Sequence, residues 1–77
     1  MKTYIVDIQT KNALDVIDFI PRKDERIILN NGWQKNECVV DCVVHDTSKK
    51  MTIVFVNIVE PCYSDMISRI SWSLVRG

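Results

Sequence analysis

Apolar and polar residues alternate near the start of the chain, with the period of two that a half-buried β-strand shows. The alternation puts two sets of side chains on opposite faces: Tyr4, Val6 and Ile8 on one, and Thr3, Ile5, Asp7 and Gln9 on the other. The polar run at residues 10–12 interrupts the pattern. We therefore predict a strand over residues 3–9 with one face turned inward.

Residues 13–20 fit two interpretations. A helix would begin at an Asn12 cap, with Asp15 three residues later. A strand would instead run into Pro21 through the extended backbone that is favoured before proline. We favour the strand because of the family resemblance described below. The charged residues 21–26 that follow predict a solvated loop.

The short apolar run at residues 27–29 is also open to two interpretations. Its β-branched pair, Ile27 and Ile28, favours a strand. The following Asn31-Gly32 dipeptide is typical of a two-residue hairpin turn. The alternative is a short helix that ends near Asn31 and uses Gly32 as its left-handed cap.

The clearest pattern is a pair of β-branched runs, residues 37–45 and 51–59, around the polar residues 46–50. It predicts an antiparallel hairpin, with the register left open because one residue more in the loop exchanges the faces. The first strand carries an unbroken apolar face, made of Cys38, Val40, Cys42 and Val44. The second is apolar on both faces: Thr52, Val54, Val56 and Ile58 oppose Met51, Ile53, Phe55, Asn57 and Val59. A helix, barrel closure or another subunit must cover its second face.

The C-terminal residues 62–76 predict an amphipathic helix that begins near Pro61. Its apolar stripe consists of Tyr63, Met66, Ile67, Ile70 and Leu74. The alternative is a final strand, because residues 70–74 also alternate between apolar and polar side chains. The helix explains more positions.

The chain has 77 residues, 47% of them apolar, and its ten basic side chains cancel its ten acidic ones. These values predict a single globular domain over residues 1–77 and speak against the cationic surface of a nucleic-acid binder. So short a chain builds a marginal core, which favours self-association. No secretory signal or membrane span is apparent and the cysteine count is odd, so we expect free thiols in the cytoplasm.

Candidate chemistry centres on His45 and on the three cysteines, Cys38, Cys42 and Cys62. On a strand, Cys38 and Cys42 would lie about 13 Å apart, too far for one zinc ion or a disulfide. We interpret the cysteines as buried structural thiols and predict no metal site and no cofactor. No nucleophile motif accompanies His45, and no glycine-rich loop could hold a phosphate. We therefore predict that the protein is not an enzyme and has no catalytic residue.

Features of binding surfaces are better represented. Trp72 lies opposite the apolar stripe of the predicted C-terminal helix, near Arg69 and Arg76, a composition typical of protein interfaces. The alternative is that Trp72 folds over a sheet edge. Trp33, just after the Asn-Gly turn, is either a core residue or a partner contact. The candidate binding residues are Trp33, Trp72, Arg69, Arg76, Ile53 and Phe55.

The chain resembles small uncharacterised β-rich proteins of bacteria, phages and mobile elements in three segments: FIPRKDERIIL at 19–29, VVDCVVHD at 39–46 and TIVFVN at 52–57. Those proteins share a hydrophobic–Pro-Arg-x-x-Glu-Arg–hydrophobic motif followed by two paired strands. The resemblance covers residues 14–59 and implies an SH3-like small barrel, without supplying catalytic residues. Asp24 stands where such proteins usually carry a glycine, and the C-terminal helix lies outside the resemblance.

These observations predict an α+β fold: a β-rich, strongly bent antiparallel sheet or small SH3-like barrel of four or five strands with a C-terminal amphipathic helix. The predicted function is a non-enzymatic protein-interaction module that forms a homodimer, of phage or mobile-element origin. One alternative is a nucleic-acid-associated small barrel that binds through Trp33 or Trp72. The other is a metal site or small hydrolase around His45 and the cysteines.

Overall fold

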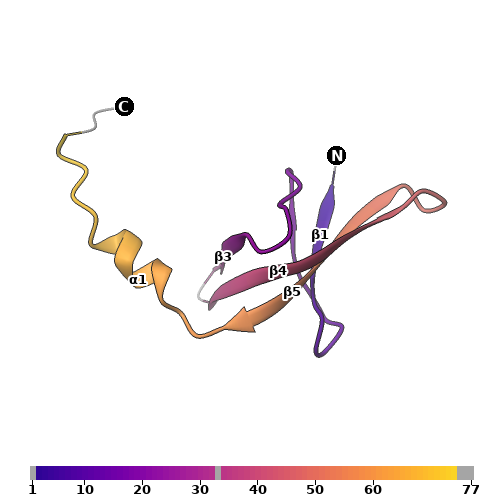
Figure 1. Ribbon diagram of the computed structural model, residues 1–77, viewed down its shortest axis with the longest axis horizontal. Coiled ribbons are helices and arrows are strands. Elements are labelled where there is room, and N and C mark those ends of the chain that lie inside the picture. Colours follow the sequence, from indigo (N-terminus) through magenta and orange to yellow (C-terminus); the bar gives the residue numbers. More distant parts are fainter. Residues whose placement is uncertain (1, 33, 75–77) are drawn as a thin grey trace.

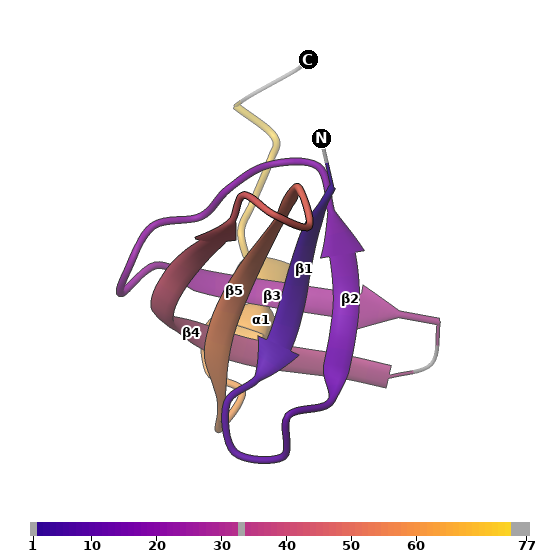
Figure 2. The ribbon, with the colours of Figure 1, turned by 90° about the vertical axis from the view of Figure 1, so that its right-hand side faces the viewer.

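The computed structural model describes residues 2–32 and 34–74, which contain five strands and one short helix (Figure 1). In chain order they are β1 (Thr3–Asp7), β2 (Ala13–Ile17), β3 (Arg26–Asn31), β4 (Gln34–Asp46), β5 (Met51–Val59) and α1 (Tyr63–Ser68). The strands form one sheet in the order β2-β1-β5-β4-β3, which curls into a half-barrel (Figure 2). The predicted β-rich, strongly bent sheet is thus confirmed.

The sheet is mixed, however, and the prediction of a purely antiparallel sheet is wrong. β1 runs parallel to β5, with Tyr4 beside Ile53 and Val6 beside Phe55. The pairs β1–β2, β3–β4 and β4–β5 are antiparallel. In a sequence, a short turn motif predicts that the two flanking strands pair antiparallel. Two distant strands that pair in parallel have no turn motif between them. The sequence pattern therefore did not predict the β1–β5 pairing.

β4 is 13 residues long and contains a β-bulge near its middle. Asp41 is the extra residue, between Val40 and Cys42. An extra residue bends the strand and reverses the direction of the side chains that follow. Cys38 and Val40 therefore face the core, whereas Cys42 and Val44 face the opposite side of the sheet. The unbroken apolar face predicted for this strand is wrong for that reason.

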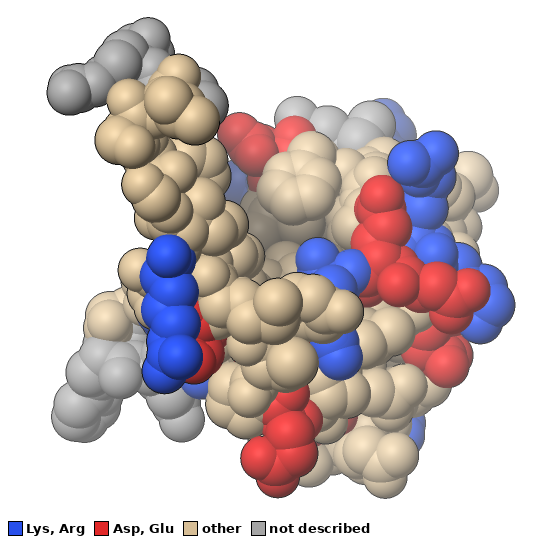
Figure 3. Space-filling model, turned by 60° about the vertical axis from the view of Figure 1, so that its left-hand side comes forward, with Lys and Arg blue, Asp and Glu red and all other residues tan. Residues whose placement is uncertain are grey.

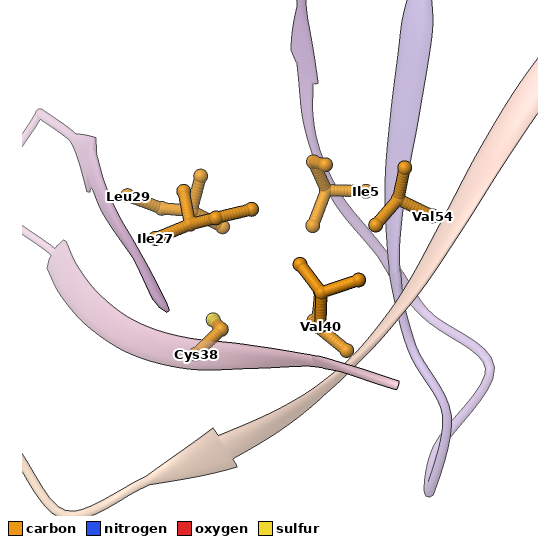
Figure 4. Close-up of a cluster of buried hydrophobic side chains, with 7 residues drawn as sticks. Ile5, Ile27, Leu29, Cys38, Val40 and Val54 are labelled. Atoms are coloured by element: carbon orange, nitrogen blue, oxygen red, sulfur yellow. The ribbon is translucent and has the colours of Figure 1, made fainter. Parts of the chain in front are cut away.

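The core lies inside the curl of the sheet (Figure 4). Seven buried side chains from β1, β3, β4 and β5 meet there: Ile5, Ile27, Leu29, Cys38, Val40, Val54 and Val56. Three partly buried side chains, Leu14, Ile17 and Val43, pack against this cluster. The curl thus covers one of the two apolar faces of β5.

The inward face of β1 is its less apolar one. Thr3, Ile5 and Asp7 are buried, whereas Tyr4 and Val6 on the other face are half-buried. Buried polar groups need hydrogen-bond partners. The Asp7 carboxylate accepts hydrogen bonds from residues of the following turn, the Gln9 backbone N–H and the Thr10 hydroxyl, both at 3.0 Å.

Both ambiguous segments in the first half of the chain contain strands, as favoured, although β2 ends at Ile17 and residues 18–20 lie outside it. Arg26, expected in the charged loop, is the first residue of β3, and Asn31, expected in the turn, is its last. Gly32 has a φ of 64°, the left-handed conformation that glycine adopts without steric cost. The hairpin of β4 and β5 is confirmed, with residues 47–50 as its loop.

The C-terminal helix is shorter than predicted. The expected helix over 62–76 is limited to α1, and residues 70–74 are not helical. No residue of α1 is buried, so its apolar stripe does not pack on the sheet as an amphipathic helix would. Serines compete with the helix for backbone hydrogen bonds, and the Ser68 hydroxyl donates to the Asp65 carbonyl at 2.7 Å. Within residues 2–32 and 34–74, no helix has the length and apolar character that crossing a membrane requires.

Candidate interaction surfaces

The side of the sheet opposite the core carries a block of apolar residues. The strand register aligns them in two rows across β2, β1, β5 and β4: Val16, Tyr4, Ile53 and Val44 in one, and Ala13, Val6, Phe55 and Cys42 in the other. Paired residues of neighbouring strands point to the same face of a sheet. We call these eight residues the outer face. Every one of its positions is apolar.

No segment of the described chain covers the outer face. Figure 2 views these four strands from that side, with β3 and α1 behind them. Val16 and Val44, at the two ends of one row, are 47% and 42% exposed. Ile53 and Phe55, on the central strand, are half-buried because their neighbours flank them. The second apolar face of β5, which the sequence required to be covered, is thus open in the isolated chain.

A second apolar surface lies at the C-terminal end of the chain. It consists of Tyr63, Met66, Ile67, Ile70, Trp72 and Leu74, each of them exposed. The segment after α1 stands away from the sheet (Figure 1), and Figure 3 shows its uncharged surface in the foreground. We call these six residues the C-terminal surface. A groove of about 570 Å³ separates part of α1 from the sheet, lined by Ile28 and Val39 on the strands and by Tyr63 and Ile67 on the helix.

One buried carboxylate attaches α1 to the sheet. The side chain of Glu37, in β4, has no exposed surface. Its Oε1 accepts hydrogen bonds from the backbone N–H groups of Cys62, Tyr63 and Ser64 at 2.9–3.1 Å. The Nε of Arg26 lies 3.1 Å from its Oε2. These contacts place a negative charge against N–H groups at the start of the helix, which have no carbonyl partner within the helix itself. A carboxylate is favourable at this position.

Electrostatics keep this carboxylate ionised. Burial raises the pKa of Glu37, but the hydrogen bonds from Cys62, Ser64 and Tyr63 and the charge of Arg26 outweigh it, so the pKa lies below its ordinary value. The Arg26 guanidinium also lies over the ring of Tyr63, 4.8 Å from its centroid. Arg26 was predicted to lie in a solvated loop; it lies on β3 instead, where 33% of its side-chain surface stays exposed.

Sequence reasoning missed the role of Glu37. The one available signal was a lone acidic residue at the start of an otherwise apolar run. Such a residue is normally solvated, and only the path of the chain after β5 brings the start of α1 to it. These hydrogen bonds join Glu37 to residues that follow it by 25 to 27 positions in the chain.

The structure separates the predicted binding residues into two groups. Ile53 and Phe55 lie at the centre of the outer face, whereas Trp72 belongs to the C-terminal surface and is 59% exposed. Arg69 forms an ion pair with Asp65 at 3.3 Å. Trp72 is exposed as predicted, although it lies beyond the helix rather than on its polar side. The predictions for Trp33 and Arg76 fall on residues outside the described ranges.

The candidate chemical residues are dispersed. Cys38 is buried, Cys42 is half-buried and Cys62 is exposed, so the prediction of buried thiols holds only for the first. Burial, and then the nearby charges of Asp7 and Glu37, raises the pKa of the Cys38 thiol. Across the described ranges, histidine, cysteine and carboxylate side chains form no cluster of three that could hold a metal ion.

His45 has a structural contact. Its Nδ1 lies 3.0 Å from the hydroxyl oxygen of Thr52, its direct neighbour across the hairpin. A cross-strand pair of this kind stabilises the hairpin. The contact joins the two strands of the hairpin next to its loop.

Comparison of the chain with protein-family models, with curated proteins and with solved structures gave no match. The resemblance to SH3-like small proteins therefore stays a prediction from residues 14–59.

Proposed function

We propose that the protein is a small, non-enzymatic protein-interaction module that associates with itself. One observation carries the proposal: the outer face has apolar side chains at all eight positions of two cross-strand rows, and no described segment covers it. Antiparallel sheets that face water alternate apolar and polar side chains. An apolar surface of this kind on so small a domain is typical of an interaction site.

The central position of the outer face supports protein binding. Interfaces place apolar and aromatic residues at the centre and polar residues at the rim. Phe55, Ile53 and Tyr4 occupy the middle of the block. The next position on β4, paired with Met51, is Asp46, and the position on β5 beyond Phe55 on the same face is Asn57. Each of the two neighbouring rows thus pairs one polar side chain with an apolar one, Asp46 with Met51 and Asn57 with Val39.

Charge pairing gives less support to the nucleic-acid alternative. A nucleic-acid binder needs cations that are free to neutralise phosphates. Four cationic side chains of the described chain lie instead against carboxylates: Arg22 by Glu25, Lys23 by Asp24, Arg26 by Glu37 and Arg69 by Asp65. The formal net charge of the whole chain is zero.

The finer assignments form part of the same proposal. We propose an SH3-like small barrel of phage or mobile-element origin that acts in the cytoplasm. The motif resemblance over residues 14–59 and the odd number of cysteines support these points.

Sedimentation of the purified protein tests self-association. We expect the weight-average mass to rise from one chain toward two between about 1 µM and about 1 mM. A mass of one chain over the whole range would contradict the self-association. The measurement is made under reducing conditions, so that the exposed Cys62 cannot join two chains by a disulfide.

A further inference from the structure

We propose that two copies of the chain stack their outer faces against each other, forming a two-sheet sandwich with Ile53 and Phe55 near its centre. This inference rests on the proposed self-association, to which it adds the surface and the geometry. A two-fold contact uses the same surface patch on both copies. The outer face fits that requirement because its centre carries no charge that would meet its own copy.

Sheet geometry gives the size of the contact. Four strands about 4.8 Å apart and two rows about 6.8 Å apart span an apolar block of roughly 19 by 14 Å. One flanking row on each side extends it to roughly 19 by 27 Å, which is on the order of 500 Å² per copy. Because the sheet is curled (Figure 2), the roughly 1,000 Å² that two copies would bury together is an upper limit, at the low end of specific interfaces. We therefore expect the sandwich to be a weak, reversible dimer.

A second copy suits the outer face better than an internal segment does. The curl of the sheet covers the inner face, and Glu37 holds the one described helix against β4. Neither element covers the outer face. Stacked sheets lie about 10 Å apart, so side chains from both copies would interdigitate into one apolar layer. That layer would shield the second face of β5, as its composition requires.

The three cysteines of the chain are natural probes of this contact. Cys42 belongs to the outer face, Cys62 is exposed near α1, and Cys38 is buried in the core. Maleimide labelling, read out site by site with mass spectrometry, gives the rate for each thiol as a function of protein concentration. We expect the labelling of Cys42 to slow at least about fivefold from about 1 µM to about 1 mM, while the rate at Cys62 stays constant.

Two matched variants distinguish the faces. Val44 and Ile58 are 42% and 44% exposed and lie on the same hairpin, but Val44 belongs to the outer face and Ile58 points to the opposite one. Val44→Lys places a charge in the contact twice, once from each copy, so we expect dimerisation to weaken by about 100-fold. Ile58→Lys introduces the same charge at equal exposure, and we expect it to leave dimerisation within about threefold of the unmodified protein.

The possible outcomes separate this inference from the proposed function. Protection of Cys42, together with loss of the dimer in Val44→Lys alone, supports the sandwich. A dimer in which Cys62 is protected and Cys42 is not, or one that Val44→Lys leaves intact, overturns the sandwich but not self-association. A mass of one chain at every concentration overturns both. Circular dichroism of both variants verifies that the sheet is retained, and Cys42 protection in the unmodified chain needs no variant.

Discussion

The attachment of α1 through one carboxylate leads to a sharp prediction for Glu37→Gln. Glutamine has nearly the same shape as glutamate but is neutral, and one of its two terminal atoms is an NH₂ donor. The three backbone N–H groups that meet Oε1 would keep an acceptor without charge. The NH₂ group would face the Arg26 Nε–H, donor against donor. The substitution should therefore release α1 from the sheet.

The size of the effect follows from the number of bonds. Charge-assisted hydrogen bonds are about twice as strong as neutral ones. Weakening each of the three backbone bonds should therefore shift the equilibrium between attached and detached α1 by roughly a factor of five toward the detached state. Together they give about a 100-fold increase in the population in which α1 is detached. The core is unaffected, because none of its seven buried side chains contacts this carboxylate through a hydrogen bond.

Amide hydrogen exchange at Cys62, Tyr63 and Ser64, measured by NMR, reports this population directly. We expect their protection to fall about 100-fold in Glu37→Gln, while amides of β5 such as that of Val54 keep theirs. The unmodified protein should show the same loss in acid. Because the folded pKa of Glu37 is lowered, its contribution is complete above the unfolded pKa of about 4.3 and disappears as the pH falls through the folded pKa.

Glu60→Gln is the matched control, since Glu60 is an exposed carboxylate two residues before Cys62. It removes the same charge nearby and should leave the three amides unchanged. Equal exchange in Glu37→Gln and the unmodified protein would refute the role of the carboxylate. Protection that does not change with pH through the acid range would refute it independently of any substitution.

Three further predictions concern stability and reactivity. Ile5→Ala removes a fully buried core side chain and should lower the free energy of unfolding, measured by urea titration, by about 2–5 kcal/mol. Leu74→Ala, at a 95% exposed position, should change it by less than about 0.5 kcal/mol. Equal effects of the two substitutions would contradict the described core. Gly32→Ala places a side chain on a residue whose φ is 64°, with no atom near enough to crowd the new Cβ. The free energy of unfolding should therefore fall by about 1–2 kcal/mol through backbone strain alone. An unchanged free energy of unfolding would show that the turn relaxes. Cys38 should react with maleimide only as fast as the chain unfolds, because the thiol is buried and its pKa is raised, while Cys62 reacts at once; comparable native rates would argue against this packing.

Local patterns predicted the strands well. β-branched alternation located β1 and the hairpin of β4 and β5, and the Asn-Gly pair located the turn after β3 to within one residue. Each of these signals is carried by residues close together in the chain. The parallel pairing of β1 with β5 and the contact of Glu37 with α1 depend on distant segments instead. No local pattern encodes them.

The candidate site was predicted in composition but not in extent. The pattern of β5 predicted that Ile53 and Phe55 share one face, opposite Val54 and Val56, and the structure confirms this alternation. The rest of the outer face depends on the bulge at Asp41, which turns Cys42 and Val44 outward. A bulge inserts one residue without a distinctive sequence signal, so parity beyond it could not be predicted. The bulge adds two apolar side chains to the exposed block.

The two exposed apolar surfaces differ in how firmly the fold holds them, and this difference ranks them as docking sites. Four hydrogen-bonded strands hold the side chains of the outer face in place before a partner arrives. The C-terminal surface depends on a six-residue helix without buried residues, attached mainly through Glu37. Ordering a loosely held segment on binding costs free energy that a rigid surface does not lose. The outer face should therefore bind first and with less dependence on pH, whereas any contact through Trp72 should weaken when Glu37 is protonated or replaced by glutamine.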